Sequence, residues 1–200
     1  MKKLLVSAFF LLTTFGASAQ TVTLKNGEIL RGRFVQERFL AGFSKPVVSE
    51  GNFSLLPGFG LIWQAEQPFP VMTTITASGL VQSVDGTETA RLSASRLPFL
   101  PRLYDMLSGA LSGDTSALEG EFTVTITPDG RMRRVRLLPK RADAALGLAI
   151  QSMDIHVDHF VERVEILKPG GDKDRLIFKN QVIRKGEPNS VELRALGAAK

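Results

Sequence analysis

The sequence predicts a mainly β fold of the α+β class, in which a large, curved antiparallel sheet carries helices on one face. Short runs of strand-forming residues recur along most of the chain, separated by turn-forming residues, which is typical of strands joined by hairpins. Two longer segments have apolar residues at helical spacing instead. Because each of these segments has an apolar stripe, we expect both to pack on the sheet.

The chain opens with the features of a cleaved secretory signal peptide over residues 1–19. Lys2 and Lys3 precede an apolar run from Leu4 to Phe15, and Ala17-Ser18-Ala19 is a small-x-small cleavage site. The alternative is an uncleaved anchor. The apolar run is about a dozen residues long, whereas a membrane-spanning helix needs about 20, so cleavage is the favoured interpretation.

The expected mature chain is one domain, residues 20–200, that begins at Gln20 and resides in the periplasm. Removing residues 1–19 leaves 181 residues and lowers the formal charge from +5 to +3. This mildly basic balance does not suggest a nucleic-acid partner. The sequence has no cysteine, which excludes a disulfide framework, thiolate catalysis and cysteine-based zinc sites.

The first half of the mature chain is expected to form six strands in hairpin order. These strands are expected at residues 32–40, 51–56, 60–65, 71–77, 79–84 and 88–92. Side chains two positions apart share a face of a strand, so Leu61 lies beside Trp63, and Phe53 lies beside Leu55. Asp85-Gly86 predicts a hairpin turn because both positions tolerate positive φ.

Further strands are expected at residues 120–127, 131–138, 152–158, 160–167 and 174–178. Pro128-Asp129-Gly130 is the strongest turn signal in the chain. A second turn, at residues 169–172, separates the last two strands. The repeated hairpin connections predict an antiparallel sheet.

Two segments are expected to be helices. The first, Leu97 to Leu111, has Phe99, Leu103 and Leu107 among its apolar residues at helical spacing. The second, Ala142 to Gln151, has a stripe that includes Leu146 and Ile150.

Catalysis and metal binding find little support in the sequence. There is no P-loop, no nucleophile elbow and no HExxH motif, so we expect neither an enzyme nor a bound cofactor. His156 would share a strand face with Asp154 and Asp158, which leaves a metal site or a solvent-facing polar strand as alternatives. One histidine with two carboxylates is a poor transition-metal site.

A basic cluster follows the strongest turn and comprises Arg131, Arg133, Arg134 and Arg136. On a strand, Arg134 and Arg136 point to one face while Val135 and Leu137 point to the other. A solvated sheet face is the simpler interpretation. Docking to an acidic partner or to anionic headgroups is the alternative.

Between residues 32 and 80, a set of residues occurs in a characteristic order: Phe34 and Gln36, then Gly51, then Leu61 and Trp63, then Pro68 and Gly79. This order and spacing resemble the outer-membrane lipoprotein carrier (LolA) family, which has an F-x-Q strand, a small-Gly strand, an apolar-x-Trp strand, a Pro and a turn with Gly. The later order of helix, strands and helix is compatible with the family to about residue 180.

The resemblance implies an unclosed antiparallel β-barrel whose concave apolar side is covered by helices that act as a lid. It also implies a monomeric periplasmic carrier that takes acylated cargo from an inner-membrane exporter to an outer-membrane acceptor. The expected cavity lining is Phe34, Phe53, Leu55, Leu61, Trp63, Phe99, Leu103, Leu107, Leu146 and Ile150. The same side chains could instead form an ordinary core. A lipid-processing hydrolase or a non-binding adaptor on the same fold is the alternative function.

The chain departs from the family in two places. Leu55-Leu56-Pro57-Gly58 has no basic residue where the family has the Arg that bonds to the lid. The family's long N-terminal helix is not evident between Gln20 and Arg31. Both departures weaken the expectation of a lipoprotein cargo more than they weaken the expectation of a lipid.

Overall fold

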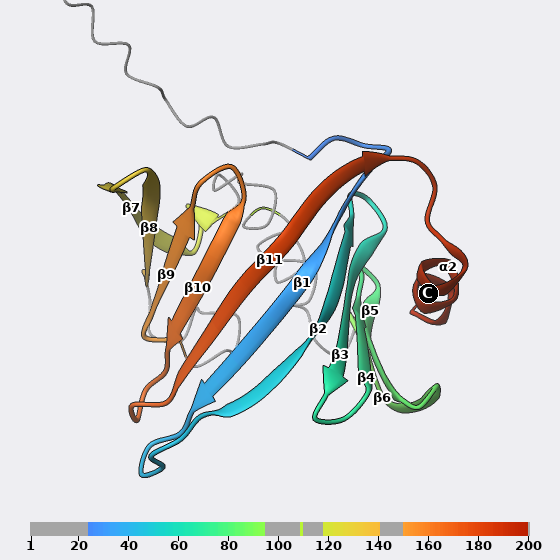
Figure 1. The fold of residues 1–200 in the computed structure, drawn as a ribbon, viewed down its shortest axis with the longest axis horizontal. Coiled ribbons are helices and arrows are strands. Elements are labelled where there is room, and N and C mark those ends of the chain that lie inside the picture. The colour runs from blue at the N-terminus through green and yellow to red at the C-terminus, as the bar shows by residue number, and fades with distance from the viewer. Residues whose placement is uncertain (1–23, 95–108, 110–117, 141–149, 200) are drawn as a thin grey trace, which may run out of the picture.

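The computed structural model describes residues 24–94, 109, 118–140 and 150–199. These residues form eleven strands and one helix (Figure 1). The strands are β1 (Glu28–Phe39), β2 (Val47–Leu56), β3 (Gly60–Gln67), β4 (Val71–Ile75), β5 (Gly79–Val84), β6 (Thr87–Ser93), β7 (Phe122–Asp129), β8 (Met132–Pro139), β9 (Ser152–Val157), β10 (Val161–Leu167) and β11 (Lys173–Lys185). The helix is α2 (Ser190–Ala198).

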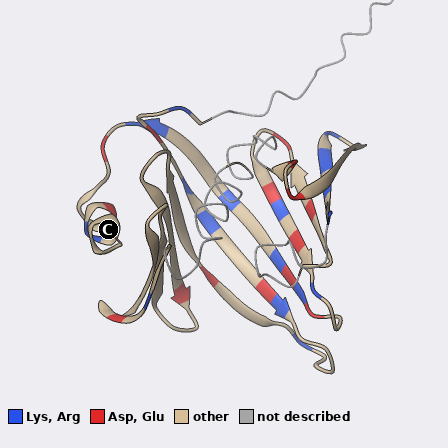
Figure 2. Cartoon of the chain, turned by 180° about the vertical axis from the view of Figure 1, so that it is seen from behind, with Lys and Arg blue, Asp and Glu red and all other residues tan. Residues whose placement is uncertain are grey.

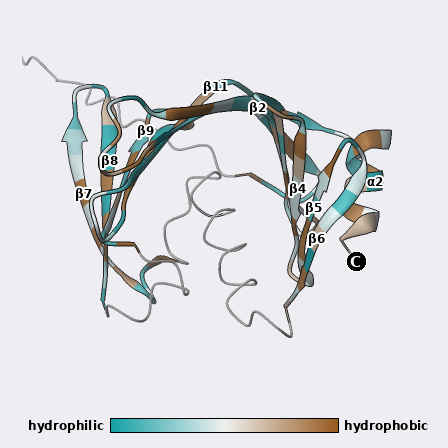
Figure 3. Cartoon of the chain, turned by 90° about the horizontal axis from the view of Figure 1, so that it is seen from below, coloured by the Kyte–Doolittle hydropathy of each residue, from teal (hydrophilic) through white to brown (hydrophobic). Residues whose placement is uncertain are grey.

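All strands belong to one antiparallel sheet in the order β6-β5-β4-β3-β2-β1-β11-β10-β9-β8-β7. Apart from β6 and β7, strands that are neighbours in sequence pair with one another, and β1 pairs with β11 near the centre of the sheet. Seen from below, the sheet bends into an arch with β7 and β6 at its two ends (Figure 3). These two strands do not pair in the part of the chain that the structure describes. The predicted unclosed antiparallel sheet is therefore confirmed.

The predicted turns join the strands for the reason that the sequence suggests. In the β5–β6 hairpin, Asp85 and Gly86 have φ angles of 49° and 77°. Gly130 in the β7–β8 hairpin has a φ of 63°. Asp and Gly adopt positive φ at a low steric cost, so the chain reverses at these residues.

The C-terminal part of the chain differs from the sequence-based prediction. Strand β11 continues to Lys185, seven residues past the predicted end, and helix α2 was not predicted. The helix begins at a capping box: the Asn189 side chain accepts from the backbone N–H of Glu192, and the Glu192 carboxylate accepts from the backbone N–H of Asn189. Asn followed three residues later by Glu was a usable sequence signal for this helix start.

Helix α2 covers the outer, convex face of the sheet (Figure 3). Its Ala195 and Leu196 side chains pack in a small core against outward-facing side chains, including those of Leu56 and Ile62. The helices predicted for the concave face are other segments of the chain, so α2 is an additional element that the sequence analysis missed. The physical reason for its position is that these strands carry apolar side chains on both faces, and the outer ones also need cover.

The two predicted helices fall mostly outside the described residues. Of the segment 97–111, only Gly109 is described, and it is helical. The segment 142–151 is described only at Ile150 and Gln151, which are not helical. The backbone N–H of Gln151 donates to the carbonyl oxygen of Leu167, which extends the β9–β10 pairing instead.

Candidate functional site

The concave face of the arch carries one continuous apolar cluster, built from inward-facing side chains of the sheet. Alternation along each strand selects them: Leu55 and Leu61 face inward, while their neighbours Leu56 and Ile62 face outward. The buried members of this inner-face cluster are Leu30, Phe34, Phe53, Leu55, Leu61, Ile75, Leu118, Phe122, Val135, Leu137, Ile150, Met153, Ile155, Val157, Val161, Val164 and Phe178.

Four aromatic rings meet at the centre of this face, and we call Phe34, Phe53, Trp63 and Phe178 the aromatic centre. The rings of Phe34 and Trp63 stack with their centroids 3.8 Å apart. Phe178 meets Phe53 edge to face at 5.3 Å and meets Trp63 edge to face at 6.0 Å. The two edge-to-face contacts of Phe178 have the geometry that aromatic pairs favour, so they stabilise the centre beyond simple burial.

Gly32 on β1 leaves space for the Phe53 ring of the aromatic centre. Gly32 lies opposite Phe53 in the β1–β2 register. A Cβ atom at Gly32 would lie 2.7 Å from the ring atom Cε1 of Phe53, which is closer than real Cβ contacts. The ring therefore occupies the space that a side chain would need.

The structure brings together every predicted lining residue that it describes. Phe34, Phe53, Leu55, Leu61 and Ile150 belong to the inner-face cluster, and Trp63 packs against it in a partly buried position. The other predicted residues, Phe99, Leu103, Leu107 and Leu146, lie outside the described part of the chain.

The prediction missed the half of the inner face that β7 to β11 contribute. Val135 and Leu137 on β8 face inward beside Met153 and Ile155 on β9. Their alternation with polar residues was visible in the sequence and signalled an apolar strand face. Phe178 was missed as a member of the aromatic centre because its partner strand, β1, is about 140 residues away in sequence.

The outer face of the same strands carries a charge network. The Nε atom of Arg134 lies 2.9 Å from an Asp154 carboxylate oxygen, and that of Arg136 lies 3.9 Å from it. Arg175 bonds to Glu165 at 2.9 Å and to Glu37 at 3.1 Å. Figure 2 shows bands of both charges side by side on the strands. Most of the predicted basic cluster is thus neutralised within the sheet, which favours a solvated face over an anion-docking surface.

The histidine pattern belongs to this outer network. The His156 Nδ1 atom lies 3.0 Å from an Asp129 carboxylate oxygen, and Nη2 of Arg163 lies 3.1 Å from Nε2 of the same ring. Asp154 is held by Arg134. Within the described ranges, no group of three His, Asp or Glu side chains could hold a metal ion.

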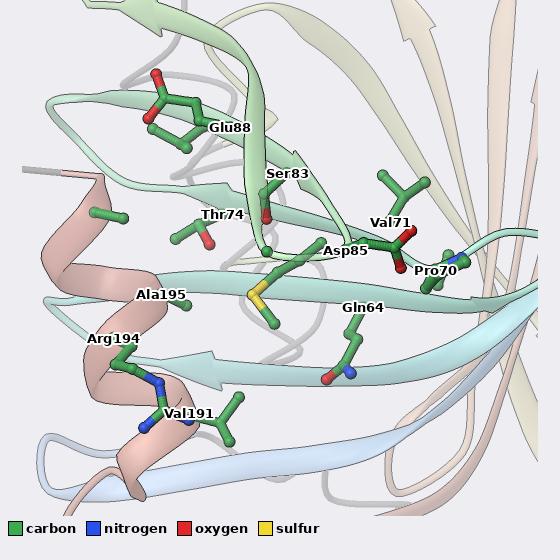
Figure 4. Close-up of a pocket in the computed structure, with 15 residues that line it drawn as sticks. Gln64, Pro70, Val71, Thr74, Ser83, Asp85, Glu88, Val191, Arg194 and Ala195 are labelled. Carbon is green, nitrogen blue, oxygen red and sulfur yellow. The ribbon is translucent and has the colours of Figure 1, made fainter.

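Two open grooves flank helix α2 on the outer face. The larger has a volume of about 520 Å³, and Figure 4 shows Val191, Arg194 and Ala195 of the helix among its lining residues. The smaller, of about 440 Å³, lies on the other side of the helix and includes Arg31 and Glu192. No ring of the aromatic centre lines the larger groove.

An ion pair fixes the helix between these grooves. Arg31 on β1 donates two hydrogen bonds of 2.7 Å to the Glu192 carboxylate. Burial raises the pKa of Glu192, but the hydrogen bonds from Arg31 and from the Asn189 backbone outweigh it, so the pKa lies below its ordinary value. Both grooves therefore owe their shape to a docked helix rather than to a catalytic constellation.

No helix within the described residues is long and apolar enough to cross a membrane.

Several solved structures match the chain at low sequence identity. A Pseudomonas aeruginosa MucA/MucB complex matches at 16% identity over 83% of this chain, with a TM-score of 0.38, and this chain spans 55% of the matched chain. A LolA superfamily protein from Nitrosomonas europaea matches at 8% identity over 84% of this chain and 91% of its own, with a TM-score of 0.42. A putative outer membrane lipoprotein-sorting protein domain from Vibrio parahaemolyticus matches at 9% identity over 86% of this chain and 93% of its own, with a TM-score of 0.43.

The family assignment rests on sequence. No curated protein matches the chain. The profile of one family, described as outer membrane lipoprotein carrier protein LolA-like, matches residues 19–175, which include β1 to β10 and the start of β11. The chain belongs to the LolA-like family of outer membrane lipoprotein carrier proteins.

Proposed function

We propose that this protein is a periplasmic carrier that binds the acyl chains of a lipoprotein or another lipid against its concave face and carries them from the inner to the outer membrane. The observation that supports it most is the aromatic centre within one apolar cluster, on the inner side of a sheet that stays open. The family match agrees with such a role. The predicted residues outside the described ranges belong to the same proposed site.

Energetics explain why such cargo needs a carrier. Moving one methylene from water into an apolar site is worth about 0.8 kcal/mol, so an acyl chain of a dozen methylenes gains roughly 10 kcal/mol from burial. An unprotected chain would therefore rarely cross an aqueous compartment. The proposed function has no catalytic step, and the partners are an inner-membrane exporter and an outer-membrane acceptor.

Binding of a fluorescent fatty-acyl probe to delipidated protein tests the carrier function. Leu61→Glu places a charge on the inner face, so it should weaken probe binding strongly if ligand reaches this face. Leu138→Glu is the matched control, because Leu138 lies on β8, is 42% exposed and faces outward. It should bind the probe like the wild type. Trp63 is the only tryptophan in the chain, so its emission gives a second readout of binding.

The outcome that contradicts the proposal is a wild-type protein that binds no acyl probe, together with a Leu61→Glu variant that loses its cooperative thermal transition. The inner face would then be an ordinary core. Solvent extraction of protein purified from its native host should in addition release a lipid, whose identification would name the cargo.

Localisation has its own test. Mass spectrometry of the protein from its native host should find Gln20 as the first residue, because cleavage is expected after Ala19. A full-length product would contradict the periplasmic assignment.

A further inference from the structure

Arg133 stands apart from the other arginines of its cluster. Arg131 lies 3.7 Å from Asp158, and Arg134 and Arg136 both pair with Asp154. In the described part of the chain, no ion pair includes Arg133, and its buried Nε atom has no hydrogen-bond partner. A buried donor without an acceptor costs free energy, so this guanidinium lacks an acceptor that a ligand could supply.

The strand register places Arg133 on the concave face. Val135 and Leu137, two and four residues further along β8, both belong to the inner-face cluster. Arg133 lies directly opposite Val157 of β9, which is another member of that cluster. Since β8 has no register shift in either pairing, Arg133 starts from the same side of the sheet as these apolar residues.

We propose that Arg133 binds the anionic head of the cargo, a carboxylate or a phosphate attached to an acyl chain. This inference rests on the proposed carrier function and specifies its substrate class. The guanidinium carries a permanent charge and a planar set of donors that matches carboxylate and phosphate oxygens. An anion there supplies the acceptor that Nε lacks.

The dimensions of the sheet suit such a ligand. Neighbouring strands lie about 4.8 Å apart, so β8 and β1 are separated by roughly 19 Å along the curved sheet, with β9, β10 and β11 between them. One leaflet of a bilayer has a hydrocarbon depth of about 15 Å, which is half of the roughly 30 Å core. An acyl chain with its head at Arg133 therefore extends across β9 to β11 toward the aromatic centre.

Competition against a bound fluorescent acyl probe tests this assignment. The competitors are a long-chain fatty acid, a phosphatidylglycerol, and the fatty alcohol and diacylglycerol that share their chains but carry no charge. Wild-type protein should prefer an anionic ligand to its neutral counterpart by about tenfold to a hundredfold, as expected for hydrogen bonds to a charged group. The preferred anionic competitor distinguishes a carboxylate head from a phosphate head.

Variants then locate the preference. Arg133→Gln should remove it while leaving affinity for the neutral ligands unchanged, and Arg133→Lys should keep part of it. Arg136→Gln is the matched control, since it removes one positive charge from the outer face of the same strand. It should keep the full preference.

Stability gives a readout that a structural role would not produce. Arg133 is half-buried and has no ion pair among the described residues, so replacing it by an apolar side chain should not destabilise the ligand-free protein. Arg133→Leu should therefore melt at or above the wild-type temperature. The inference is overturned if wild-type protein binds anionic and neutral ligands equally, or if Arg133→Gln weakens both classes alike. Failure to bind any of the ligands would contradict the carrier function itself.

Discussion

Gly32 shows how a single residue shapes the inner face. The Phe53 ring lies over it and is almost fully buried, so the ring has little space into which it can move. A methyl group at Gly32 would also lie 3.1 Å from Cγ of Gln181. Alanine gains about 0.5–1 kcal/mol over glycine inside a strand, but overpacking a core costs about 1–3 kcal/mol, so the steric cost should win.

We therefore expect Gly32→Ala to lower the free energy of unfolding by about 1–2 kcal/mol, measured by urea denaturation. Gly120→Ala is the control, because a Cβ atom there meets no atom within 4 Å. Equal changes in the two variants would show that the Phe53 ring is not held against β1.

Among the elements, helix α2 depends on its contacts with the outer face of the sheet for its stability. It has nine residues, and isolated helices shorter than about 12 residues are marginal in water. The Glu192 side chain is 5% exposed and serves both the capping box and the Arg31 pair. Glu192→Gln keeps the shape of the side chain but loses its charge, so we expect a loss of about 1–3 kcal/mol at neutral pH.

The pH dependence of this loss follows from the pKa of Glu192. Because the pKa in the folded protein lies below the unfolded value of about 4.3, the ionised carboxylate stabilises the fold above that pH. The contribution disappears as the pH falls through the folded pKa. Thermal unfolding should therefore separate wild type from Glu192→Gln at pH 7 and bring them together in acid. Glu88→Gln, which breaks an exposed pair with Arg91, should show little difference at either pH.

At the scale of the whole molecule, the pairing of β1 with β11 joins the two ends of the described chain. Arg38 on β1 faces Asp174 on β11, and their side chains bond at 2.9 Å. Without β11, the β1–β6 half and the β7–β10 half would have no strand between them. We expect a chain ending at Leu167 to lose cooperative unfolding, as monitored by circular dichroism.

A chain ending at Glu187 is the control for this truncation, because it keeps β11 and removes only α2. It should retain the sheet signal and a cooperative transition at a lower temperature, since Leu56 and Ile62 lose their cover. Cooperative folding of the shorter chain would show that the two halves do not depend on the central pairing.

Local patterns in the sequence were sufficient for the parts of the fold that depend on neighbouring residues. Alternation indicates that Leu61 and Trp63 share a face, and Asp85-Gly86 indicates the hairpin turn. Local patterns could not predict where α2 packs, because its own sequence contains only an N-terminal cap and a few apolar residues. The outer surface that it covers is formed by side chains of four strands, β1 to β4, together.

Short-range patterns were therefore enough to predict the hairpins and the inward and outward sets of side chains, and to reveal the resemblance to the carrier family. The meeting of Phe178 and Phe34 in one aromatic centre and the place of α2 outside the arch are visible only in the folded molecule. The same is true of Arg134, which pairs with a carboxylate, and of Arg133, one residue away, which has no partner among the described residues. The reason is that side-chain direction is a local property of the backbone, whereas a partner across the sheet is set by strand order and register.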